Sequence, residues 1–455
     1  MRCKRLVGGL REGWRLLPGI SVAPAATTMI CALLVLPASA QITSIPDSWV
    51  NNYDHARIES LLEIGQELQE NHDYDGAEAE FDQALQLSRV SEGLYNPRQF
   101  DIVGRLLEVL MLQENWPEFD QQLAYLEALS QQNYGNDRPA MIDAVDETAR
   151  WYRAAAVRVN DSRGNWYLIR AKHLNWIAVT LAEREYGRDD SRVAPLLYQV
   201  VLDHYYQSVS NQRRGMTSYE YRTLSKTPID GWSQTRYESV KNSYRIGKEV
   251  LQRIRGIYAS TGEATVTDAL LLMQLADWEL LFGYGDRALQ LYADVHEELV
   301  LAGVDQADID AYFMRTTILP EPVLVTELPD AADKGQSPVR LTGWSKSYPG
   351  AVRPQAQTAL FRSVATPDNA IRLRLEITAN YQSSSQIRRW FTDFEYSIAS
   401  ISTLDDNAGG DVLLRQAYEE VAEFNFRPRF SGGKLVPAES VILEYTPAGL
   451  YSEAR

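Results

Sequence analysis

The spacing of small and aromatic residues is the feature that most constrains the fold of this chain. Two small residues lie twelve positions apart, an aromatic residue follows the second by four positions, and this arrangement occurs twice. The two sets are Gly65, Ala77 and Phe81, and Ala276, Ala288 and Tyr292. Such a spacing predicts two antiparallel helices that cross closely at the small residues. It also predicts that the bulky side chain packs where the second helix meets the next helix pair.

A third unit, Val103 to Leu123, keeps the apolar spacing but has lost the small residues, so its helices should lie further apart. Between 168 and 185 the apolar residues follow the period of an amphipathic helix. The sequence therefore predicts a mainly α chain, with a stack of helix pairs from about residue 50 to residue 305. A plain helix bundle is the alternative, because amphipathic helix pairs also form bundles.

The first unit resembles the tetratricopeptide repeat. It reads Leu61-x2-Ile64-Gly65-x2-Leu68, then Tyr74, Ala77-x3-Phe81 and Ala84. It departs from that family at Arg89, where a closing proline is common. The resemblance implies a solenoid, and solenoids of this kind present a concave surface to extended partners.

In that family the first helix of each pair lines the concave face. The resemblance therefore implies a set of candidate binding residues on the two best units: Glu63, Gln66, Glu67, Gln274 and Asp277. They are polar and lie beside positions expected to be buried, namely Ile64, Leu68, Leu275 and Ala276. Their acidity predicts a partner segment that is basic or rich in hydrogen-bond donors.

A basic and aromatic stretch, 211–258, interrupts the acidic chain with ten basic and four acidic residues. It could be a docking patch for an acidic peptide or glycan, with Arg213, Arg214 and Trp232 as candidate binding residues. The interpretation that we favour is a loop followed by a solvated helix face whose basic residues pair with acidic residues of the repeats.

The first 40 residues have the pattern of an export signal. A basic stretch ends at Arg15, a short apolar core runs from Met29 to Leu36, and Ala38-Ser39-Ala40 follows. We therefore expect cleavage after Ala40 and a periplasmic mature protein, whose only route to the membrane is a partner or an uncleaved leader. Both cysteines, Cys3 and Cys31, lie in this leader. The remainder has 40 basic and 60 acidic residues, a balance that disfavours nucleic acid as a partner.

The C-terminal part of the chain has a different residue pattern. Prolines are frequent from 317 to 356, which predicts a connector. Beyond it, Ile371 to Ile377 alternates apolar and polar residues, and further strands are expected at 394–401 and 439–445. An amphipathic helix is expected at 411–424.

This region resembles the C-terminal domain of TonB-type energy transducers. The resemblance is specific from Ala417 to Tyr445, where an aromatic-rich Phe426-Arg427-Pro428 segment precedes the turn Gly432-Gly433. It implies a small α+β domain. The expected organisation is a signal peptide (1–40), a helical repeat domain (41–316), a linker (317–356) and the α+β domain (357–455). The leader contains no histidine and no proline-rich rod is present, so energy transduction is not implied.

We found no catalytic signature. The five histidines form no metal-ligand spacing, and neither a nucleophile elbow nor a phosphate-binding loop occurs. We therefore expect no cofactor, no metal and no enzymatic activity, and we interpret the chain as a scaffold that binds envelope proteins or peptides. The alternatives are a TonB-like transducer with a retained anchor and, third, an enzyme acting on the cell wall. The sequence leaves the oligomeric state open.

Overall fold

The computed structural model describes residues 47–159, 163–213, 234–261, 265–315, 317–328, 339–342, 371–381, 394–403 and 425–446. The chain divides into two units, Met1–Asp47 and Ser48–Arg455, and the second contains both the helices and the C-terminal strands. The expected leader and the helix expected at 411–424 lie outside the described residues.

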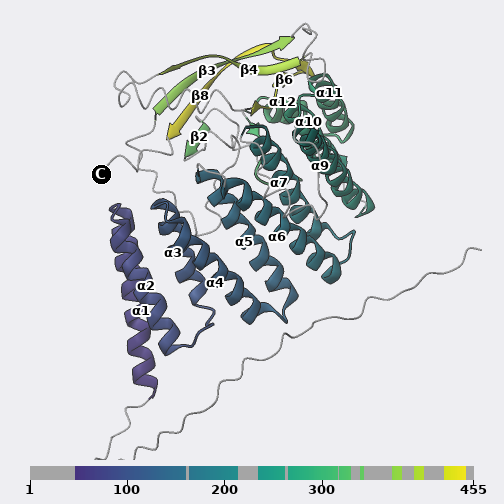
Figure 1. Ribbon diagram of the computed structural model, residues 1–455. Coiled ribbons are helices and arrows are strands. Elements are labelled where there is room, and N and C mark those ends of the chain that lie inside the picture. The colour runs from purple at the N-terminus through teal and green to yellow at the C-terminus, as the bar shows by residue number, and fades with distance from the viewer. Residues whose placement is uncertain are drawn as a thin grey trace, which may run out of the picture. The chain divides into compact units, whose positions relative to one another are not determined.

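The described residues are mainly helical, which agrees with the expected fold class and is compatible with a helical-repeat fold. Helices that follow one another in the chain pack side by side (Figure 1). The helices are α1 (Asp47–Glu70), α2 (Tyr74–Ser91), α3 (Gln99–Leu112), α4 (Trp116–Tyr134), α5 (Arg138–Arg158), α6 (Arg163–Glu185), the short η1 (Ser191–Val193), α7 (Ala194–Arg213), α9 (Gln234–Thr261), α10 (Thr265–Leu281), α11 (Gly285–Leu301) and α12 (Gln306–Phe313).

Four of the described interhelical turns share one geometry. The φ angles are 63° at His72 in the α1–α2 turn, 59° at Glu114 in the α3–α4 turn, 81° at Gly283 in the α10–α11 turn and 79° at Gly303 in the α11–α12 turn. Each donates its backbone N–H to the carbonyl three residues earlier, and the next residue donates to the carbonyl five residues earlier. This pair of bonds caps the final carbonyls of the first helix and turns the chain into the second. The first three turns belong to the three units identified from the sequence spacing, and the fourth follows the last of these units.

Phe81 explains why residue 65 is a glycine. Both residues are buried, and a Cβ atom added to Gly65 would lie 2.4 Å from Cε1 of the Phe81 ring. The close crossing of α1 and α2 predicted from Gly65 and Ala77 is therefore confirmed. Phe81 packs within its own helix pair as well as facing α3, where the Arg105 guanidinium lies 6.0 Å from its ring centroid.

We expect Gly65→Ala to lower the free energy of unfolding by about 1–3 kcal/mol, because the added methyl group forces the Phe81 ring or the helix axes to shift. Gly256→Ala is the matched control. That helical glycine of α9 has no atom within 4 Å of an added Cβ, so alanine there should be neutral or stabilising by up to about 1 kcal/mol. Chemical denaturation of both variants measures the difference, and equal effects would contradict this account of the crossing.

Helix α10 lies at the centre of the core. Every residue from 269 to 279 is buried, so this helix has no solvated face. Helices α9 and α11 pack against it, and chain segments from beyond residue 316 hydrogen-bond to it. A helix buried on all sides must satisfy its polar side chains within the protein.

The C-terminal strands form one four-stranded sheet of order β2-β8-β3-β4 and two short pairs, β1-β5 and β6-β7. Strand β8 is parallel to β2 and antiparallel to β3, and β4 is antiparallel to β3. The strands are β1 (Ile318–Leu319), β2 (Val339–Thr342), β3 (Ile371–Tyr381), β4 (Phe394–Thr403), β5 (Asn425–Phe426), β6 (Phe430–Ser431), β7 (Lys434–Leu435) and β8 (Ala438–Thr446).

The three strands predicted from sequence are confirmed as β3, β4 and β8. In β3, Leu373, Leu375 and Ile377 are fully buried and Arg374 between them is exposed, as the period of two requires. The predicted glycine turn is also confirmed, because Gly432 and Gly433 have φ angles of 55° and 73° and join β6 to β7.

Candidate functional site

The candidate residues of the first helix lie on an accessible face of α1. Glu63 and Glu67 are exposed, and neither side-chain carboxylate has a hydrogen bond or ion pair with another described residue. Gln66 is half-buried; its amide donates to the Glu70 carboxylate at 3.0 Å, and its oxygen accepts from Nη1 of Arg105 at 3.2 Å. The structure therefore brings Glu63, Gln66 and Glu67 together on one helix face.

Ile64 corrects one expectation. The repeat pattern places it among the buried positions, but it is 43% exposed, whereas its counterpart Leu275 in α10 is 7% exposed. The difference arises because α1 is the first described helix, whereas α10 lies between α9 and α11. Leu68 is only partly buried and packs at the edge of the core.

The candidate residues of the later unit are buried instead of solvated. Gln274 and Asp277 of α10 are 3% and 4% exposed. The Asp277 carboxylate accepts two hydrogen bonds from Arg427, from Nε at 2.9 Å and from Nη2 at 2.5 Å. It also accepts one from the Tyr292 hydroxyl at 2.8 Å. Arg427 belongs to the aromatic-rich segment that follows β5, so this face of α10 contacts the chain's own C-terminal part.

Glu321 completes the buried group. Its carboxylate accepts from Nη2 of Arg427 at 2.7 Å and from the Gln274 amide at 3.2 Å, and its backbone carbonyl accepts from the Tyr198 hydroxyl at 2.8 Å. Further along the same segment, the Thr326 carbonyl accepts from the Thr267 hydroxyl at 3.0 Å. Residues 317–328 therefore run along α10, although their prolines predicted a connector.

The charges in this group are unequal, because one guanidinium faces two carboxylates. Burial raises the pKa of Asp277 above its usual range, and the charge of Arg427 opposes that rise. For Arg427, burial would lower the pKa, but the attraction of Asp277 and Glu321 raises it well above its usual range. The guanidinium stays charged and holds the C-terminal segment against α10.

Apolar contacts support the same attachment. Phe426 and Phe430 are 1% and 4% exposed, so both rings belong to the core. The ring of Phe430 lies 5.7 Å from that of Tyr292 and 5.5 Å from that of Phe313. Its aromatic partners therefore include residues of α11 and α12.

A second buried polar group joins α5, α6 and α7. Asp203 has no exposed side-chain surface; it accepts from Nη2 of Arg153 at 2.8 Å and from the Asn175 amide at 2.5 Å. Burial lowers the pKa of Lys172 to about 8, and burial with the nearby charge of Lys172 lowers the pKa of His204 to about 3. His204 is therefore neutral at pH 7. Sequence reasoning missed this group, because its members lie on three helices with no local motif.

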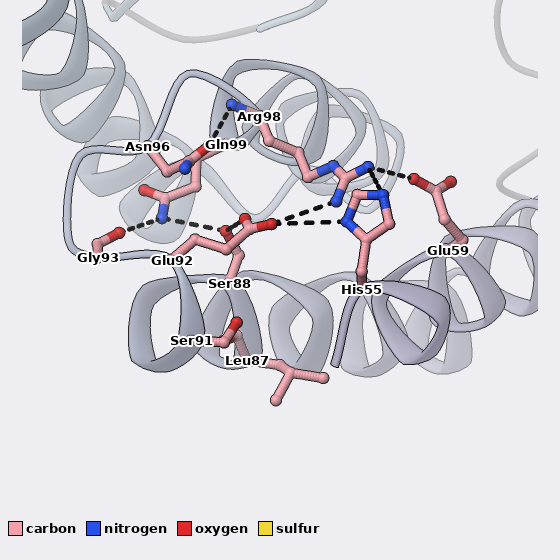
Figure 2. A network of polar contacts seen from close by, with 10 residues as sticks. All are labelled: His55, Glu59, Leu87, Ser88, Ser91, Glu92, Gly93, Asn96, Arg98 and Gln99. Carbon is pink, nitrogen blue, oxygen red and sulfur yellow. Dashed lines mark hydrogen bonds and ion pairs between the residues drawn. The ribbon is translucent and has the colours of Figure 1, made fainter. Parts of the chain in front are cut away.

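A third network fastens the start of α1 (Figure 2). Arg98, in the turn before α3, donates to Glu59 at 2.9 Å, to Glu92 at 3.2 Å and to the His55 ring nitrogen Nε2 at 2.7 Å. Gln99 beside it donates to the Gly93 carbonyl at 2.8 Å. Gln99 is buried, but the charged side chains of the network are partly exposed, so their ion pairs contribute modestly to stability while fixing α1 relative to the α2–α3 turn.

The basic stretch 211–258 is described only in part. Arg213 is the last residue of α7 and its side chain lies outside the described residues, as do Arg214 and Trp232. Basic residues of α9 pair with acidic residues of other helices. The pairs are Lys248 with Glu279 at 2.5 Å, Arg253 with Glu183 at 2.7 Å, and Arg255 with Asp268 at 2.5 Å and with Glu298 at 3.3 Å. For these three residues, the interpretation as a face paired with acidic helices holds.

Two negative findings apply to the described part of the chain. Within it, no three or more His, Cys, Asp or Glu side chains are arranged to hold a metal ion. None of the helices described there is both long and apolar enough to cross a membrane. No protein-family model matches the chain, and no curated protein matches its sequence significantly.

Proposed function

We propose that this chain is a non-enzymatic scaffold of the bacterial cell envelope that binds other proteins through the exposed face of α1. The observation that carries this proposal is the pair Glu63 and Glu67, whose carboxylates are exposed and have no hydrogen bond or ion pair with another described residue. Elsewhere in the described residues, the buried Asp203, Asp277 and Glu279 are engaged by basic side chains of the chain itself. A charged face left open at the end of a helical stack is suited to a partner of opposite charge.

The finer architecture belongs to the same proposal. The presence of the same turn in all three repeat units supports a tetratricopeptide-type array for the helices. The strands β3, β4 and β8 with the Phe426-Arg427-Pro428 segment support a TonB-type C-terminal fold. The leader pattern supports export to the periplasm, and N-terminal sequencing of protein from the envelope fraction tests that step, since a mature chain that still begins at Met1 contradicts it.

Charge reversal tests the proposed surface. We expect Glu63→Lys with Glu67→Lys to weaken partner capture from envelope extract roughly tenfold at low salt, because two attractive charges become repulsive. The remaining capture should depend less on salt, and the helical content should not change, since both side chains are exposed. Quantitative pull-down at two ionic strengths and far-UV circular dichroism measure these outcomes.

The matched control is Glu78→Lys with Asp82→Lys. It makes the same change of charge on α2 of the same helix pair and should leave capture within about twofold of the wild type. Capture that is indifferent to the reversal at Glu63 and Glu67 and to salt removes α1 as the binding surface.

A further inference from the structure

The equivalent turns align α1 with α10 position by position. Nine and six residues before His72 are Glu63 and Gln66, and nine and six residues before Gly283 are Gln274 and Asp277. Because the two helices enter the same turn with the same hydrogen bonds, these residues occupy corresponding places on the two helix faces. The groups that contact Gln274 and Asp277 on α10 therefore indicate which groups the α1 face can bind.

On α10 these positions contact extended segments of the same chain. Strands β1 and β5 pair antiparallel, and the residues that follow each strand, Glu321 and Arg427, reach Gln274 and Asp277. The decisive contact is a guanidinium that meets a carboxylate through two parallel N–H···O bonds. This face of a first helix thus binds an arginine presented by an extended segment.

On α1 the corresponding position also receives an arginine. The Gln66 oxygen accepts from Arg105 of α3. Glu63 and Glu67 on either side stand four residues apart, so both carboxylates lie on the same helix surface and can approach one cation. Within the described chain, nothing pairs with them.

The negative charge of the first helix pair favours a positively charged binding partner. Residues 47–91 contain eleven acidic and two basic side chains, a net charge of −9 out of −16 for the whole chain. A field of this strength attracts basic segments and repels acidic ones.

We propose that the α1 face binds an extended peptide segment of another protein, and that Glu63 and Glu67 together bind an arginine of that segment. This inference rests on the proposed scaffold function and names the class of partner. The preference is for arginine over lysine, because the planar guanidinium presents paired donors to two carboxylates, whereas an ammonium group acts as a point charge.

The test uses the full chain and a fluorescently labelled peptide, Asn-Phe-Arg-Pro-Arg-Phe, which copies residues 425–430. Two further peptides carry lysine or glutamine in place of both arginines. Fluorescence anisotropy is measured with the wild type, with the Glu63→Gln/Glu67→Gln variant and with the Glu78→Gln/Asp82→Gln control, which loses the same charge on α2.

We expect the arginine peptide to bind the wild type and the control within twofold of each other, and to bind the Glu63→Gln/Glu67→Gln variant at least tenfold more weakly. We expect the lysine peptide to bind several-fold more weakly than the arginine peptide, and the glutamine peptide not to bind. Equal losses in the two variants, or binding unchanged by Glu63→Gln/Glu67→Gln, overturn the inference. So does self-association of the chain in sedimentation that disappears in that variant, because the occupant is then a second copy.

The proposed function fails on a different result. Capture of envelope proteins that persists in the Glu63→Gln/Glu67→Gln variant leaves the scaffold in place and removes only the arginine site. If the chain captures no envelope protein but binds the peptide as expected, the scaffold function is contradicted and the arginine site is retained.

Discussion

Arg427→Met should be among the most damaging single substitutions in the described part of the protein. It removes the only guanidinium in contact with Asp277 and Glu321 there and leaves two carboxylates in the core without a counter-charge. Removing one partner of a buried ion pair costs about 3–5 kcal/mol. We expect the free energy of unfolding, measured by chemical denaturation, to fall by that amount. Arg374→Met is the control, because Arg374 is exposed on β3, and it should change stability by less than about 0.5 kcal/mol.

The loss caused by Arg427→Met should depend on pH. Burial already raises the pKa of Asp277, and Arg427 opposes that rise, so the pKa rises further in the variant. A carboxyl group whose pKa is higher in the folded state than in the unfolded state stabilises the fold when protonated, and that contribution is lost as pH rises through the folded pKa. The deficit relative to the wild type should therefore be largest near pH 8 and shrink toward pH 5. A deficit that grows on acidification would contradict the assignment to Asp277.

Arg153→Met should have the second largest effect. It leaves Asp203 in the interior with the Asn175 amide and the nearby charge of Lys172, but without its bidentate partner. We expect a loss of about 3 kcal/mol, at the lower end for a broken buried pair because Lys172 compensates in part. Thermal and chemical unfolding measure it.

The control for this prediction lies on the same helix. Arg150 pairs with Asp146 one turn earlier, and its side chain is 40% exposed. Arg150→Met should cost less than Arg153→Met, because water can replace the 40% exposed Arg150 beside Asp146, whereas Asp203 has no exposed side-chain surface. Similar losses at 150 and 153 would show that burial of Asp203 does not determine the cost.

The parts of the fold that were predicted correctly have local sequence signals. The small residue at 65 and the aromatic residue at 81 predicted a close helix crossing, and the alternation at 371–377 predicted β3, because each pattern follows from the geometry of one element. The glycines at 432 and 433 predicted their turn for the same reason. None of these signals depends on which distant segment covers the element.

The parts that could not be predicted depend on distant segments. Gln274 and Asp277 have the polar character of a solvated helix face, but Glu321, Tyr292 and Arg427, all distant in sequence, contact them in the interior. The sequence pattern is the same at Ile64 and Leu275, yet their burial differs, because the neighbours of a helix decide which of its sides are covered. Asp203 with Arg153 poses the same difficulty, since residues fifty positions apart meet without a motif.

The buried face of α10 also affects the order in which the chain can complete its fold. Asp277 meets its counter-charge 150 positions later in the sequence, and synthesis proceeds from the N-terminus. When α10 has emerged, its carboxylate has no cation to offset desolvation, so full burial of that helix is unfavourable until the segment around 427 follows. The first helix pairs rely on neighbours close in sequence and carry no such delay. The last helices therefore complete their packing late, in the same folding step in which the C-terminal segment docks on them.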